Sequence, residues 1–204
     1  MSASAGPVRQ VTELDTRGPD AAAGAGRWVV VPEVSEARFH VRDKLISTAH
    51  GVMPVQEGAV ALSDAGDLVT GWVDVSVVGI ATGNTHRDKD LRGRRFLDAE
   101  HHPSVRVQVR QASRTSAGWV ASAVVTARGK QAPVELVAEI LAESDGEVQV
   151  HVTGHLDRAP LGIKAPTFIV ARVVALDADL TFRREAGAEE IGNEKPGGRH
   201  TSTD

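Results

Sequence analysis

The sequence of 204 residues contains no cysteine, no tyrosine and only four phenylalanines. Without cysteine the chain can form no disulfide, thiolate nucleophile or cysteine-based metal site. Cysteine usage therefore does not indicate whether the protein belongs to an oxidising or a reducing compartment. The first thirty residues contain no apolar run of signal-peptide length, and no stretch of the chain approaches the length of a membrane span. We therefore predict a cytoplasmic protein without a transmembrane segment.

The chain also lacks a strong excess of charge of either sign. Its net charge is −4 and its isoelectric point is about 6.1. A protein that binds nucleic acid by neutralising phosphates presents a basic surface, and such a surface is not indicated here. The basic run at residues 92–95 is short and fits a solvated loop beside a helix end. Nucleic acid is therefore not an expected partner.

The two ends of the chain lack the periodic apolar pattern of folded elements. Residues 1–26 and 185–204 are rich in Gly, Ala, Pro, Ser and charged residues, a composition typical of disordered segments. Residues 27–184 suit a single domain, because all-β sandwiches and barrels of this size routinely form one unit. We predict one domain between two disordered tails.

What the middle of the chain does contain is a clear two-residue alternation of apolar and polar residues, which is typical of strands with one buried face. The turn signals at residues 63–67 and 144–146 separate such strands. The alternation places Trp72 on the polar side. These features predict an all-β fold, an antiparallel barrel of about eight strands that hides its apolar face by closing. The inward positions include Phe39, Val41, Val73, Val75, Val77, Val107, Val109, Leu136, Ile140, Val150, Val152, Leu176, Leu180 and Phe182.

One long segment, residues 82–103, interrupts this alternation. Asn84 is a good helix N-cap, because its side-chain oxygen can accept from the free N–H groups of the next turn. The sequence predicts a short helix over 85–91 that stops at Gly93 with a left-handed residue. Phe96 and Leu97 are the apolar residues that can anchor this helical excursion to the barrel.

The same segment resembles the YceI-like family, through Thr82, Asn84, Arg87-Asp88, Leu91-Arg92, Phe96, Asp98 and Pro103. Residues 126–134 are similar to the family's strand-connecting turn, and residues 156–158 with 161–163 are similar to its Asp-Arg-x-x-Phe-Gly element. The chain departs from the pattern at Asp90, where the family usually has His, and at Leu161, where it usually has an aromatic residue. The resemblance covers residues 27–184. It implies a lipocalin-like barrel that holds a polyisoprenoid or a similar long-chain lipid.

The predicted interior favours ligand binding over catalysis. Small Val, Leu and Ala side chains can leave an apolar cavity, which suits an acyl or isoprenoid chain at roughly 0.8 kcal/mol per buried CH₂. The candidate ligand-binding residues are the inward positions given above together with Ile80 and Phe96. An alternative is a ligand-free, filled barrel that acts as a protein-interaction module or a homodimer. An enzyme would need two titratable residues that converge inside the cavity, and none stands at the inward positions.

The histidines do not favour a metal site or a catalytic site. His101 and His102 would point to opposite sides of an extended chain, and His86, His151 and His155 lie beside polar residues as solvent-facing positions do. The sequence contains no nucleophile elbow and no phosphate-binding glycine loop. No metal and no cofactor are expected.

Two charged pairs, Arg87-Asp88 and Asp157-Arg158, have two interpretations. They could clamp the polar head group of a ligand at one end of the barrel. They could instead form a network that holds the helical excursion against the barrel and satisfies its backbone groups, which is the interpretation we favour.

Overall fold

The computed structural model describes residues 25–43, 48–144, 146–163 and 170–185. The predicted tails lie outside these ranges except at their inner edges, where β1 begins at Gly26 and Glu185 follows the last strand. The elements, in chain order, are β1 (Gly26–Val30), the 3-10 helix η1 (Pro32–Val34), β2 (Glu36–Asp43), β3 (Thr48–Leu62), β4 (Leu68–Ser76), α1 (Thr85–Arg92), β5 (Ser104–Arg114), β6 (Gly118–Ala127), β7 (Lys130–Ser144), β8 (Glu147–Asp157) and β9 (Val170–Arg184).

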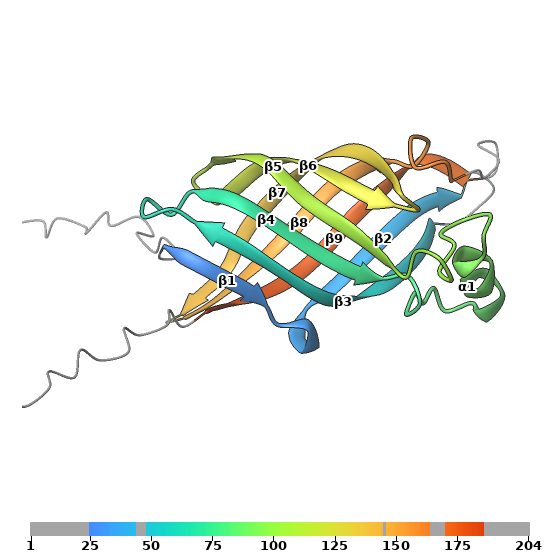
Figure 1. The fold of residues 1–204 in the computed structure, drawn as a ribbon, viewed down its shortest axis with the longest axis horizontal. Helices are drawn as coiled ribbons and strands as arrows, with labels where there is room; N and C mark the ends of the chain where they lie inside the picture. The colour runs from blue at the N-terminus through green and yellow to red at the C-terminus, as the bar shows by residue number, and fades with distance from the viewer. Residues whose placement is uncertain (1–24, 44–47, 145, 164–169, 186–204) are drawn as a thin grey trace, which may run out of the picture.

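The strands form one closed antiparallel barrel (Figure 1). Neighbouring strands follow the order β1-β3-β2-β9-β8-β7-β6-β5-β4, and pairing of β3 with β4 closes the ring. Both β1 and β2 pair with β3 on one side and with β9 on the other, so η1 divides what is otherwise a single strand position. The nine strands thus occupy eight positions around the barrel, which confirms the predicted lipocalin-like architecture.

The two-residue alternation predicted from the sequence sets the inside and outside of each strand. In β7, Val134 and Leu136 are buried while Glu135, Val137 and Glu139 are exposed. The alternation slips where the register shifts between Ile140 and Ala142 opposite β8. A bulge of this kind adds one unpaired residue and turns the following side chains. The inward and outward sides of the strands therefore follow the sequence pattern, except beyond such bulges.

Trp72 lies on the polar side, as the alternation predicts. The guanidinium of Arg106 covers its ring at 4.3 Å from the centroid. The same guanidinium donates to both carboxylate oxygens of Asp74, at 2.8 and 2.6 Å. Trp72 and Asp74 alternate with the inward-facing Val73, so the aromatic ring is held outside the barrel by its neighbour on β5.

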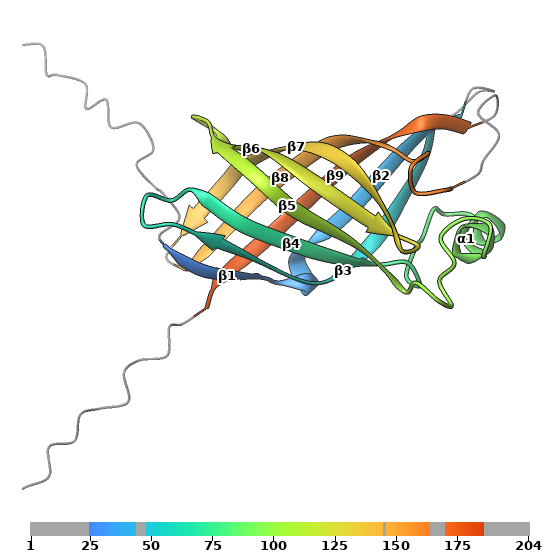
Figure 2. The ribbon, with the colours of Figure 1, turned by 45° about the horizontal axis from the view of Figure 1, so that its top comes forward.

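The helical excursion between β4 and β5 lies at one end of the barrel (Figures 1 and 2). We call this the α1 end; it also carries the β6–β7 hairpin and the segment after β8. The opposite end, with the turn at residues 63–67, is the far end. The β6–β7 hairpin turns through Arg128 and Gly129, both with positive φ (54° and 67°), as two-residue hairpins require. No helix of the described residues is long and apolar enough to cross a membrane.

The predicted cap of α1 is confirmed. The side-chain oxygen of Asn84 accepts from the backbone N–H groups of His86 and Arg87, each at 3.1 Å. The predicted left-handed stop is wrong: Gly93 has φ −69°, and its N–H donates to the carbonyl of Asp90. A tight turn of this kind ends the helix without needing positive φ, because the orphan carbonyl is already satisfied.

Replacing Asn84 with alanine is expected to lower the free energy of unfolding by about 1 kcal/mol, because two N–H groups of the first turn lose their acceptor. Urea denaturation followed by circular dichroism measures this loss. The variant Asn84→Asp keeps an acceptor and serves as the control. Equal losses in the two variants would contradict a capping role.

Candidate functional site

The barrel encloses a cavity of about 340 Å³. This volume falls at the lower end of the range for small-molecule sites, roughly 300–1,000 Å³. Its lining comes from every strand and from the segment after α1, and it is almost wholly apolar. Besides the predicted positions, the lining includes Trp28, Ala37, Met53, Val60, Leu62, Leu68, Leu97, Val105, Trp119, Ala121, Val125, Ala127, Ala138, Val148, Leu156, Leu161, Ile163, Val174 and Ala178.

Most of the residues that the sequence singled out line this cavity. They are Phe39, Val41, Val73, Val75, Ile80, Phe96, Val107, Val109, Leu136, Val150, Val152, Leu176, Leu180 and Phe182. Val77 and Ile140 are not among the lining residues. Val77 lies in the turn after β4, is 1% exposed, and its N–H donates to Pro103. Ile140 is partly buried, packs against the core cluster and pairs with Val150, just before the register of β7 shifts.

The far end of the cavity is closed by large side chains that the sequence reasoning missed. Trp28 is 3% exposed and Trp119 is 6% exposed, and both pack in one core cluster with Phe182. Trp28 could have been found, because in β1 it alternates with Val30 as inward residues do. Trp119 is the second residue of β6 and follows a turn. Too few alternating residues precede it to show which face of the strand it occupies.

The middle of the cavity is kept open by a belt of small side chains. Ala37 pairs with Ala178, Ala178 with Val152, and Val152 with Ala138 across four neighbouring strands. All four line the cavity. Because paired residues lie side by side on neighbouring strands, this row presents little bulk to the interior. The two-residue alternation predicted that Val152 faces inward, whereas the alignment of the row follows from the register.

One glycine makes room for an aromatic lining residue. Gly51 pairs directly with Phe39, and a Cβ at Gly51 would meet the Phe39 ring at 2.2 Å. The ring therefore lies flat across the neighbouring strand, where any larger residue would displace it. Phe39 and Phe96 give the cavity its aromatic surface at the α1 end.

The first charged pair, Arg87-Asp88, binds the start of the helical excursion. Asp88 is buried, and its Oδ1 accepts from the backbone N–H of Thr82 at 2.9 Å and from the Thr82 hydroxyl at 2.5 Å. Arg87 donates to the Thr82 hydroxyl and carbonyl, both at 2.8 Å. Every one of these bonds returns to Thr82. This arrangement fits the network interpretation of the pair.

The second pair separates into an exposed and a buried member. Asp157 accepts from the guanidinium of Arg172, with Nε at 2.8 Å. Arg158 is 6% exposed and donates to the carbonyls of Ala171 and Ile163, at 3.0 and 2.6 Å. Burial lowers the pKa of the Arg158 guanidinium. Arg158 also borders the cavity. These two bonds join the end of β8 to β9 and to the loop between them.

Two further arginines at the α1 end were not singled out from the sequence. Arg92 donates to the carbonyl of Ile80 at 2.9 Å. Arg128 donates to the carbonyls of Gly162 and Arg94, each at 3.0 Å, and so links the β6–β7 hairpin to two other segments. Their signal in the sequence was their place in the family-like motifs. Together with Arg87 and Arg158 they hold the end of the barrel through backbone acceptors.

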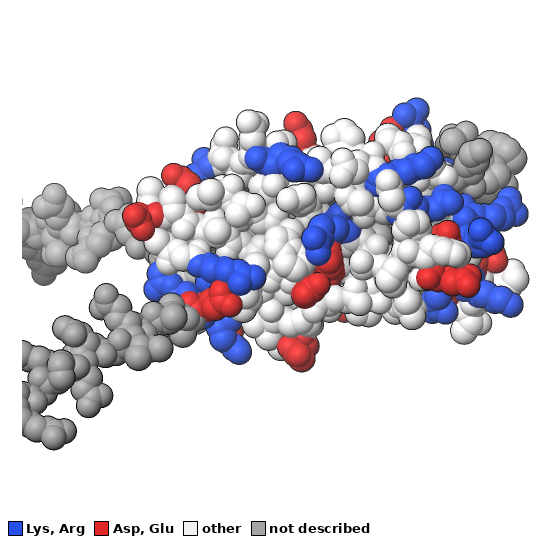
Figure 3. Space-filling model, viewed as in Figure 1, with Lys and Arg blue, Asp and Glu red and all other residues white. Residues whose placement is uncertain are grey.

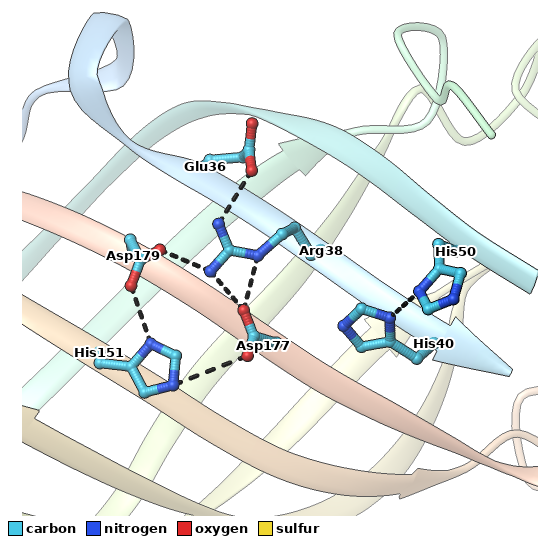
Figure 4. A network of polar contacts seen from close by, with 7 residues as sticks. All are labelled: Glu36, Arg38, His40, His50, His151, Asp177 and Asp179. Atoms are coloured by element: carbon cyan, nitrogen blue, oxygen red, sulfur yellow. Dashed lines mark hydrogen bonds and ion pairs between the residues drawn. The ribbon is translucent and has the colours of Figure 1, made fainter. Parts of the chain in front are cut away.

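A separate polar network lies on the outer face of β2, β9 and β8 (Figure 4). Arg38 donates to Asp177 at 2.6 Å and to Asp179 at 2.5 Å, and Asp179 also contacts His151 at 2.8 Å. The bond from Arg38, and then that from His151, lowers the pKa of Asp179. The carboxylates and His151 are close enough to share a cation. Arg38 already donates to both carboxylates, so this network fits a structural ion cluster better than a metal site.

The histidines predicted to face solvent do so to different degrees. His86 and His155 are exposed, while His151 faces outward but is half-buried in the network. The extended conformation expected at His101-His102 is wrong. The N–H groups of both residues donate to the carbonyl of Asp98, which places them in a turn, and His101 Nδ1 contacts the Asp98 carboxylate at 3.0 Å.

Acid should weaken the Asp157–Arg172 contact in a defined pH range. The Arg172 guanidinium and then the Ala159 N–H lower the pKa of Asp157 to about 2, below its value of about 3.9 in an unfolded chain. The contribution of Asp157 is therefore present above pH 4 and is lost as pH falls toward 2. We expect Asp157→Asn to lose less stability than wild type between pH 5 and pH 2. If urea denaturation showed the free energy of unfolding falling equally in the two proteins between pH 5 and pH 2, this prediction would be contradicted.

Comparison with known proteins agrees with the fold. A family model described as the YceI-like domain matches residues 28–183. No curated protein matches the chain.

Several solved structures are similar to this barrel. BcnA of Burkholderia cenocepacia is 15% identical, with a TM-score of 0.64, covering 74% of this chain and 98% of BcnA. A polyisoprenoid binding domain from Saccharophagus degradans, implicated in plant cell wall breakdown, is 12% identical, with a TM-score of 0.61, covering 78% and 98%. The YCEI protein of Campylobacter jejuni is 16% identical, with a TM-score of 0.62, covering 71% and 90%. At such identities the likeness shows the fold alone.

Proposed function

Because this chain belongs to the YceI-like domain family, we propose that its barrel binds a long-chain apolar ligand, a polyisoprenoid or a similar lipid, as a carrier or storage protein. The observation that carries the proposal is the apolar cavity of about 340 Å³ along the barrel. Burying a hydrocarbon chain there gains roughly 0.8 kcal/mol per CH₂. The solved polyisoprenoid binding domain of the same fold supports this ligand class.

The lining favours binding over catalysis. Among the described residues, Arg38, Arg158 and Asp177 are the charged residues that border it, and the side chains of Arg38 and Asp177 belong to the network on the outer face. Arg38 and Asp177 neutralise each other, and Arg158 donates to two carbonyls. No pair of these groups is poised to exchange a proton over a bound ligand. We therefore propose a binding protein rather than an enzyme.

A filled barrel that works through its surface is the alternative. Each described strand pairs with neighbours on both sides along at least part of its length, so none of the described strands is an edge strand of an open sheet. Cytoplasmic location and assembly as a homodimer stay predictions from the sequence.

Solvent extraction of the purified, unheated protein followed by mass spectrometry tests the proposal. A tag-matched unrelated protein is the control. We expect a stoichiometric long-chain isoprenoid or acyl species in the extract. An empty extract, repeated after expression in a native-like host, would contradict the carrier function.

A further inference from the structure

Some of the cavity lining at the α1 end reaches the surface of the protein. Phe39, Phe96 and Ile163 line the cavity at this end and are each partly exposed. Ile80 and Leu161, which also line it there, are buried. The α1 end therefore combines buried lining with apolar side chains that water can reach.

Charge is segregated between this end and the rest of the barrel. The α1 end comprises residues 41–42, 81–103, 127–131, 156–163 and 171–173, which carry ten Lys and Arg against five Asp and Glu. Over the other described side chains the ratio reverses, with seven basic and thirteen acidic residues. Figure 3 shows the basic side chains gathered toward this end of the visible face. The chain, whose net charge is −4, thus carries a basic pole at the end where some apolar lining residues are partly exposed.

Most anchored arginines of the basic pole donate to carbonyls or a hydroxyl, while Arg172 donates to the carboxylate of Asp157. Arg87, Arg92 and Arg128 donate to backbone carbonyls or a hydroxyl at the α1 end. On the outer face, by contrast, Arg38 and Arg106 donate to carboxylates. Carbonyl partners fix a guanidinium but leave its positive charge uncancelled. The field at the α1 end therefore reaches into solvent.

Exposed cations complete this surface. Arg94 and Arg95 stand side by side in the loop after α1, and Lys89 and Lys130 are exposed nearby at the same end. A phosphate-bearing surface attracts such side chains across a Debye length, while the acidic remainder of the barrel is repelled. The two effects together orient the α1 end toward that surface.

We propose that the α1 end of the barrel is a docking surface for an anionic lipid bilayer. The partner is a membrane face rich in phosphate head groups, since a lipid ligand enters and leaves water most easily where the cavity meets a bilayer. The purpose of docking, ligand exchange, rests on the proposed function. The docking itself rests on the charge segregation and on the partly exposed lining at the same end.

Cosedimentation with lipid vesicles tests this surface. The probes are phosphatidylcholine vesicles with and without about 30 mol% phosphatidylglycerol, in about 0.1 M salt. We expect wild type to bind only the anionic vesicles and to dissociate in about 0.5 M salt. The variant Arg94→Gln/Arg95→Gln should lose roughly tenfold or more in partitioning, because each basic residue near a charged surface contributes about 1 kcal/mol.

A matched variant removes the same charge from the far end. Arg114 and Arg183 are both exposed there, so Arg114→Gln/Arg183→Gln should bind anionic vesicles at least as well as wild type. Equal binding to both vesicle types, or equal losses in the two variants, would overturn the docking surface. Thermal melts establish that both variants are folded. If extraction finds no long-chain molecule while vesicle binding follows this pattern, the proposed function fails and the docking surface stands. A lipid-loaded protein that ignores anionic vesicles overturns the docking surface alone.

Discussion

Replacing Ala138 with phenylalanine is expected to abolish binding of a long-chain ligand while the barrel stays folded. Ala138 belongs to the belt of small residues that line the cavity, and it pairs with Val152 on β8 and with Trp119 on β6. A phenyl ring added there enters empty space rather than packed core, so overpacking costs at most about 1–3 kcal/mol. The ring blocks the cavity across its width.

The neighbouring residue provides the control. Val137 precedes Ala138 in β7, faces outward and is 42% exposed, so Val137→Phe adds the same ring to the outside of the barrel. Binding is measured by extraction and mass spectrometry and by titration with a fluorescent polyene fatty acid. We expect Val137→Phe to bind as wild type does and Ala138→Phe to bind neither species. Undiminished binding by a folded Ala138→Phe variant would show that the ligand does not occupy the middle of the barrel.

Replacing Arg158 with alanine is expected to lower the free energy of unfolding by about 2–4 kcal/mol and the melting temperature by several degrees. The guanidinium is buried and donates to the carbonyls of Ala171 and Ile163. Its removal leaves two polar acceptors without their donors and opens a void at the α1 end, and each unsatisfied buried group costs about 1–3 kcal/mol. Removing the arginine also removes the free-energy cost of burying its charge, which offsets part of this loss.

The adjacent exposed arginine serves as a reference. The side chain of Arg172 is 61% exposed in its ion pair with Asp157, so Arg172→Ala should cost less than about 1 kcal/mol. Calorimetric melting and urea denaturation compare the two variants. A fully stable Arg158→Ala protein that no longer binds lipid would favour the head-group interpretation of this arginine over the network interpretation.

Much of the candidate site followed from the sequence because inward and outward positions alternate along a strand. On that ground alone the sequence predicted the inward direction of four valines that line the cavity, Val107 and Val109 in β5 and Val150 and Val152 in β8. No bulge interrupts the alternation up to these residues. The pattern fails beyond Ile140, because one extra residue in β7 turns the side chains that follow and no local preference announces it.

The ends of the barrel were harder to predict. The sequence indicates loops around the histidines and arginines at these ends. The conformation of a loop depends on which carbonyls from distant parts of the chain its side chains can reach. Arg128 illustrates the point, because its acceptors, Gly162 and Arg94, belong to segments far apart in the sequence. The sequence marked the motifs that contain these residues but could not say which of them meet.

The sequence by itself determined the antiparallel barrel, the apolar character of its interior and the helical excursion with its Asn84 cap. These are local properties, set by two-residue periodicity and by side chains within a turn of their partners. The tertiary structure alone decided the level at which Ala37, Ala178 and Ala138 align, and with it the open middle of the cavity. It also decided the gathering of positive charge at one end. Register and barrel closure join residues that no local pattern connects, so cavity shape and charge segregation exist only in the folded chain.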